Sequence, residues 1–165
     1  MTREEFEKIV EEEFPAAVPE KFHHLIRNVA FLVEDEPDAQ TRREHDLLQG
    51  ETLLGLYRGV PHPARGEAYG VGTTLPDTIT LYFAPLQEEA IAIQRAAAEM
   101  LVTKYGLSTG GKDDPFDFEH AMRRAVRETI WHEVAHYFGM DEDQVHRREH
   151  ARDHGPDEAC DRCSA

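Results

Sequence analysis

The pattern that most constrains this 165-residue chain is His132-Glu133-x-x-His136, in which two histidines stand four positions apart. On a helix, side chains at this spacing lie on one face, so both imidazoles can be offered to one metal ion. Glu133 lies about 100° around the helix axis from His132, so its carboxylate can reach a metal-bound water instead of the metal. Zinc is the expected ion, because it binds neutral imidazole in a tetrahedral site with few ligands.

The residues around this pattern suit a buried helix that ends close to the metal. The flanks at 129–131 and 137–138 are apolar or nearly so, and Gly139 stands where a helix would end on a left-handed residue. Asp141 and Glu142 follow just past that turn. Either carboxylate can swing back as a third protein ligand, with the fourth position left for water. The sequence leaves the third ligand open between Glu142 and Asp141.

With these residues the sequence resembles the zincins, and more narrowly a family of small bacterial zincin-like metallopeptidases. The match is His132-Glu133-x-x-His136-x-x-Gly139-x-x-Glu142, and the family's last position holds an acidic residue or a histidine, often Asp. Segments 29–37, 53–61 and 75–85 also resemble the family, so the likeness covers residues 20 to 143. The resemblance implies a zincin-like fold, one catalytic zinc ion and a peptide or protein substrate that pairs with an edge strand beside the active-site helix.

Peptide hydrolysis at such a site needs a base beside the metal. A zinc-bound water has a pKa of about 7, and Glu133 would take its proton and pass it to the leaving amine. A second donor to the oxyanion is usual, and Tyr69, Tyr137 and His146 are candidates by chemistry alone. An alternative stays open, namely a zincin-like scaffold that binds metal and recognises a peptide or protein without cleaving it.

Hydrophobic periodicity predicts the elements that surround the motif helix. Runs at 29–33, 52–57 and 77–83 predict three strands, the last of them a half-exposed antiparallel or edge strand. Residues 87–105 read as an alanine-rich helix that ends at Gly106, and two helices precede the first strand. The expected class is α+β, in which a small mixed sheet packs against the metal-bearing helix and the alanine-rich helix.

The predicted domain organisation is a single domain at residues 1–143 and a polar extension at 144–165. The length suits one domain with one core. The extension has one large apolar residue, contains Gly155-Pro156 and is expected to be partly disordered. The histidines and cysteines of the extension are His146, His150, His154, Cys160 and Cys163. Either they form an accessory metal site, or they belong to a polar helix with a disordered end.

The formal net charge of −15 bears on partners and location. Such a surface repels phosphate backbones and anionic membranes, so neither nucleic acid nor a membrane is expected as a partner. The N-terminal segment is acidic and polar, which is wrong for a signal peptide, and the 2 cysteines form no disulfide framework. A cytoplasmic monomer is therefore expected.

Overall fold

The structure is a computed structural model that describes residues 1–66, 69, 75–106 and 117–154. The elements follow in the order α1 (Arg3–Ala17), α2 (Glu20–His23), β1 (Val29–Glu34), α3 (Ala39–Glu44), β2 (Gly55–Arg58), the 3-10 turn η1 (His62–Ala64), β3 (Asp77–Tyr82), α4 (Phe83–Tyr105), α5 (Phe118–Tyr137) and α6 (Glu142–His154). None of the described helices is long and apolar enough to cross a membrane.

The three strands form one mixed sheet in the order β1-β3-β2, with β1 parallel and β2 antiparallel to β3. This confirms the predicted α+β class with a small mixed sheet. Residues 77–83 are predicted as a half-exposed antiparallel or edge strand: β3 is antiparallel to β2, but the edge alternative is wrong, because β3 is the central strand, and so is the expected half exposure. Its second face is buried too: Thr80 and Tyr82 are 5% and 1% exposed, and Thr41 of α3 lies beside the Tyr82 hydroxyl. The hydroxyl-bearing residues alternate in sequence like a solvent-facing row, but Thr80 and Tyr82 are buried, and Thr41 of α3 covers the Tyr82 hydroxyl.

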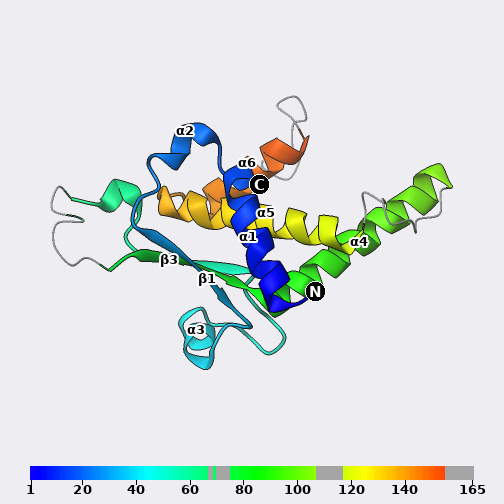
Figure 1. The fold of residues 1–165 in the computed structure, drawn as a ribbon, viewed down its shortest axis with the longest axis horizontal. Coiled ribbons are helices and arrows are strands. Elements are labelled where there is room, and N and C mark those ends of the chain that lie inside the picture. The colour runs from blue at the N-terminus through cyan, green and yellow to red at the C-terminus, as the bar shows by residue number, and fades with distance from the viewer. Residues whose placement is uncertain (67–68, 70–74, 107–116, 155–165) are drawn as a thin grey trace.

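Helix α5 runs through the middle of the molecule, and α1, α4 and the sheet all lie against it (Figure 1). Asp117 caps its first turn by accepting a hydrogen bond from the His120 N–H at 2.7 Å. Met122, Val126 and Ile130 recur every four residues and are completely buried, so one stripe of α5 enters the core. α1 and α4 pack against α5, and α5 in turn contacts β2 and β3. The motif helix is therefore held on several sides.

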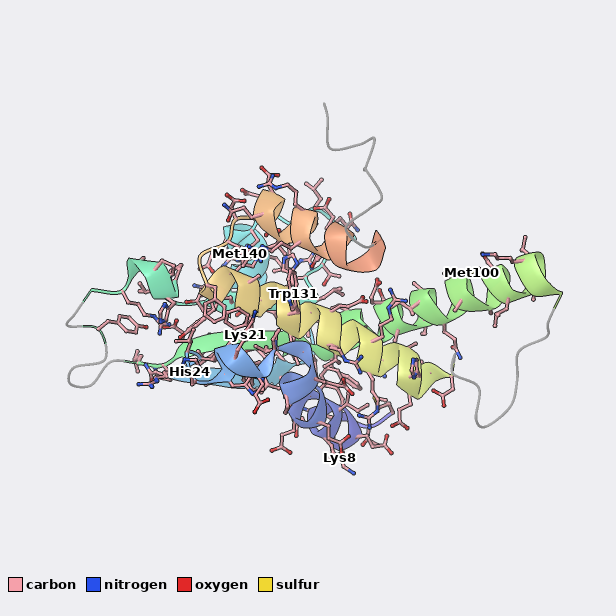
Figure 2. All side chains as sticks on the ribbon, turned by 90° about the horizontal axis from the view of Figure 1, so that it is seen from above. Lys8, Lys21, His24, Met100, Trp131 and Met140 are labelled. Carbon is pink, nitrogen blue, oxygen red and sulfur yellow. The ribbon has the colours of Figure 1, made fainter. Side chains whose placement is uncertain are left out.

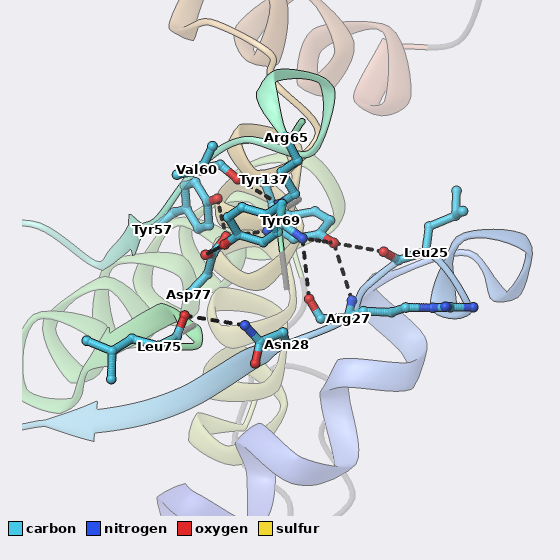
Figure 3. Close-up of polar contacts among 10 residues, drawn as sticks. All are labelled: Leu25, Arg27, Asn28, Tyr57, Val60, Arg65, Tyr69, Leu75, Asp77 and Tyr137. Atoms are coloured by element: carbon cyan, nitrogen blue, oxygen red, sulfur yellow. Dashed lines mark hydrogen bonds and ion pairs between the residues drawn. The ribbon is translucent and has the colours of Figure 1, made fainter. Parts of the chain in front are cut away.

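A buried polar network fastens the end of α5 to β2, β3 and the segment after β2 (Figure 3). The Asp77 carboxylate, 3% exposed, accepts hydrogen bonds from Tyr57 Oη at 2.6 Å and from Tyr69 Oη, and it pairs with the Arg65 guanidinium. Arg65 also donates to Tyr137 Oη at 3.0 Å and lies over the Tyr69 and Tyr137 rings. Every member thus has a partner, which is the condition for a stabilising buried network.

The charge of Asp77 makes this network sensitive to acid. Burial raises the pKa of the Asp77 carboxyl, but the Tyr57 and Tyr69 hydrogen bonds and the Arg65 charge outweigh it, so the net pKa lies below 3.8. Because the folded-state pKa is the lower one, the carboxylate stabilises the fold above the unfolded-state pKa. That contribution disappears as the pH falls from about 4 towards the folded-state value.

Asp77→Asn is expected to lower the free energy of unfolding at pH 7 by about 3–5 kcal/mol, because it leaves Arg65 buried without its anion. Urea denaturation measures the difference, and the gap to wild type should narrow below about pH 4. Tyr57→Phe removes only one hydrogen bond and should cost about 1–3 kcal/mol. A loss below about 1 kcal/mol for Asp77→Asn would contradict this role.

Candidate metal centre

The C-terminal half of α5 places both motif histidines on one side of the helix. The rings of His132 and His136 lie with centroids 4.9 Å apart and planes at 69°. Their side chains are 25% and 22% exposed, so they border a cleft instead of filling the core. Gly139 follows with a φ of +82°, which turns the chain back towards the histidines.

The turn after α5 leads directly into α6, which lies alongside α5 with Met140 in the connection (Figure 2). The Asp141 carboxylate accepts a hydrogen bond from the Gln144 N–H at 2.8 Å, and the Asp141 N–H donates one to Gln144 Oε1 at 3.2 Å. This reciprocal pair is a capping arrangement that occupies the Asp141 carboxylate. Glu142 instead turns its carboxylate to the histidines. The geometry therefore favours Glu142 over Asp141 as the third candidate ligand.

His132, His136 and Glu142 form a group whose ligand atoms all lie within 4.8 Å of one another. Glu142 Oε2 is 3.5 Å from His132 Nε2, and Glu142 Oε1 is 3.3 Å from His136 Nε2. Two ligands of a tetrahedral zinc ion, with bonds of about 2.0–2.1 Å, are separated by about 3.3 Å. The spacing of these donors and their chemistry both fit a zinc ion.

The second nitrogen of each histidine already has an acceptor. His136 Nδ1 lies 2.9 Å from the Met140 carbonyl oxygen, and His132 Nδ1 lies 3.0 Å from Glu149 Oε1. With Nδ1–H donating to these oxygens, each Nε2 is left unprotonated and faces Glu142. Sequence reasoning missed Glu149. The sequence feature that could have revealed Glu149 is its position seven residues after Glu142, which places both carboxylates on one face of a helix.

Glu133 lies on the β2 side of the histidines and is 6% exposed. Its Oε2 accepts a hydrogen bond from the Tyr57 N–H at 2.7 Å. Burial raises the pKa of Glu133 to about 7, against the opposing effect of the Tyr57 N–H and of His136. A bound cation would favour the ionised form. The carboxylate is thus fixed at one oxygen and adjacent to the candidate metal ligands.

A groove follows β2 past the two motif histidines. It consists of two adjoining hollows of about 370 and 530 Å³, both lined by Leu53, Gly55, His132 and Glu133. The first extends towards Glu128 and Glu149, and the second towards residues 57–61 and 139–142. An extended chain lying in this groove would pass directly over the histidines.

Gly55 is where β2 approaches α5 most closely. A Cβ at this position would lie 2.7 Å from Thr129 Cγ2 and 2.9 Å from Glu133 Cγ, which is closer than real Cβ contacts allow. We expect Gly55→Ala to push β2 away from α5 and to lower the free energy of unfolding by about 1–3 kcal/mol, the usual cost of overpacking.

Chemical denaturation of Gly55→Ala tests this close approach. Thr129→Ser removes the nearer methyl group, so adding it to Gly55→Ala should recover part of the loss, which a double-mutant cycle would detect. A Gly55→Ala protein as stable as wild type would show that β2 and α5 are not in such close contact.

The remaining candidate residues lie in different environments. Tyr137 is completely buried, and its hydroxyl donates to the Leu25 carbonyl at 2.8 Å, while the Tyr69 hydroxyl bonds Asp77, so neither faces the histidines. His146 is close, with its ring centroid 6.2 Å from that of His132. The proposed accessory metal site cannot be assembled from the described residues: the tail with Cys160 and Cys163 lies outside them, as do the side chains of His150 and His154.

Two histidines one turn apart on a helix with a glutamate between them are the signature of zincin metallohydrolases, and a carboxylate from the next helix is one of the third ligands that such sites use. The family model for zincin-like metallopeptidases matches residues 26–105 and 115–152, so the chain belongs to that family. The predicted family and zincin-like fold are thereby confirmed. A comparison with curated proteins found no match.

Proposed function

We propose that this protein is a zinc-dependent peptidase that cleaves a peptide bond held across α5. Membership of the zincin-like metallopeptidase family supports a metallopeptidase at the family level. The single observation that carries the finer proposal is the His132, His136 and Glu142 group, with Glu133 fixed beside it. In this proposal these three residues hold one zinc ion.

Each residue of the site has a separate task in this proposal. Zinc, when bound, lowers the pKa of a water ligand to about 7 and polarises a peptide carbonyl. Glu133 accepts the proton of the attacking water and delivers it to the departing amine. The Tyr57 N–H holds Oε2 of Glu133, which leaves Oε1 for proton transfer.

The free edge of β2 is the proposed binding surface for the substrate. The Tyr82 N–H donates to the Leu54 carbonyl at 3.0 Å, so the even-numbered residues of β2 pair with β3. The backbone groups of Gly55 and the Tyr57 carbonyl therefore point to the free edge, along the groove, whereas the Tyr57 N–H on that edge is already donated to Glu133. An extended peptide can add to such an edge as a further strand. A peptide or protein substrate, taken up by a single protein chain, is part of this proposal.

The test is hydrolysis of a mixture of unrelated peptides by zinc-loaded protein, analysed by mass spectrometry. The proposal expects internal cleavage that stops when a chelator removes the metal and resumes when zinc is returned. Peptides that bind to the protein but stay intact would favour a binding module instead of a peptidase.

A further inference from the structure

Glu149 lies two helical turns after Glu142 on the same face of α6. Its Oε1 is 3.0 Å from His132 Nδ1, and its Oε2 is 3.4 Å from His146 Nδ1. The side chain is 28% exposed, so the contact with His132 is partly shielded from solvent. α6 therefore supplies Glu142 as a candidate ligand and Glu149 as a carboxylate that contacts the outer nitrogen of a second candidate ligand, His132.

The two motif histidines differ in what holds their outer nitrogen. For His136 the acceptor is the Met140 backbone carbonyl, which any side chain at 140 would provide. For His132 the acceptor is a side chain, and substitution can remove it. A carboxylate at this position fixes the tautomer and ring orientation of a metal-binding histidine and raises the basicity of its other nitrogen.

We propose that Glu149 is a positioning residue for the metal centre, which acts through His132. It directs the Nδ1–H of His132 to itself and leaves Nε2 facing Glu142 Oε2, 3.5 Å away. The position of Glu149 depends on α6, which Val145 anchors because that side chain is 0% exposed. The polar helix after the motif thus contributes to metal affinity. This inference rests on the zinc site of the proposed function.

The experiment measures zinc dissociation constants by competition with a chromogenic chelator. Glu149→Ala is expected to raise the constant about 10- to 100-fold. Glu149→Gln keeps a neutral acceptor, and such a hydrogen bond has about half the strength of a charged one, so the expected increase is about 3- to 10-fold. Asp143→Asn is the matched control: it removes a charge from an exposed position on α6 and should leave the constant unchanged.

Thermal unfolding separates this role from a general loss of stability. The metal-free forms of wild type and Glu149→Gln should unfold at nearly the same temperature, whereas the rise on adding zinc should be smaller for the variant. Equal zinc dissociation constants for wild type and both Glu149 variants would overturn the inference, as would an equal loss in Asp143→Asn. Wild-type protein that binds no zinc would overturn the proposed function as well.

Discussion

Glu133→Gln is expected to reduce kcat for peptide hydrolysis about 10²- to 10⁴-fold, the range that a positioned general base contributes. Glutamine keeps the size of the side chain and an oxygen that can accept the Tyr57 N–H, so the surroundings of residue 133 should be preserved. It cannot take the proton of the attacking water. Because Glu133 is not among the three candidate ligands, zinc binding should remain.

The measurement compares kcat and bound zinc in the same preparations. Glu119→Gln is the matched control, since Glu119 is exposed in the first turn of the same helix and lies away from the groove. It should leave both quantities unchanged. Undiminished hydrolysis by Glu133→Gln would exclude Glu133 as the base.

His136→Ala is expected to weaken zinc binding at least about 100-fold and to abolish hydrolysis. Zinc bound by four protein ligands contributes about 10–16 kcal/mol, so one ligand corresponds to about 3 kcal/mol, or about two powers of ten. Truncation also leaves Glu142 Oε1 without its neighbour at 3.3 Å. The variant should fold, since His136 borders the cleft instead of the core.

Chelator competition measures the affinity, and circular dichroism checks the fold. His120→Ala is the matched control, because His120 is an exposed histidine in the first turn of α5, about three turns before the first motif histidine. His120→Ala should bind zinc as wild type does. If His136→Ala also bound zinc with wild-type affinity, the ion would have to be held elsewhere.

Local patterns were sufficient for much of the fold. The core-facing residues Met122, Val126 and Ile130 follow the helical repeat, and Gly106, with a φ of +64°, ends α4 as its position after an alanine-rich run predicts. The central place of β3 could not be predicted, because it depends on pairing with β1 on one edge and β2 on the other, and the burial of Tyr82 depends on a contact with Thr41 of α3. Burial by a polar neighbour leaves no hydrophobic pattern in the strand itself.

The candidate metal site also has features that the sequence predicts and features that only the structure shows. The spacing of His132 and His136 follows from helix geometry alone, and the turn at Gly139 places Glu142 within reach. The choice between Glu142 and Asp141 needs the capping contact with Gln144, which only the structure shows. The Asp77 network and the Tyr57 contact with Glu133 join positions 8 to 76 residues apart, and single-sequence patterns carry no signal for such pairs.

The most direct test of the account is the zinc content of wild-type protein purified without added metal, measured by elemental analysis against protein concentration. The account predicts close to one zinc ion per chain, as three protein donors and one open position imply. Protein that contains no zinc and takes up none from a zinc-containing buffer would contradict it.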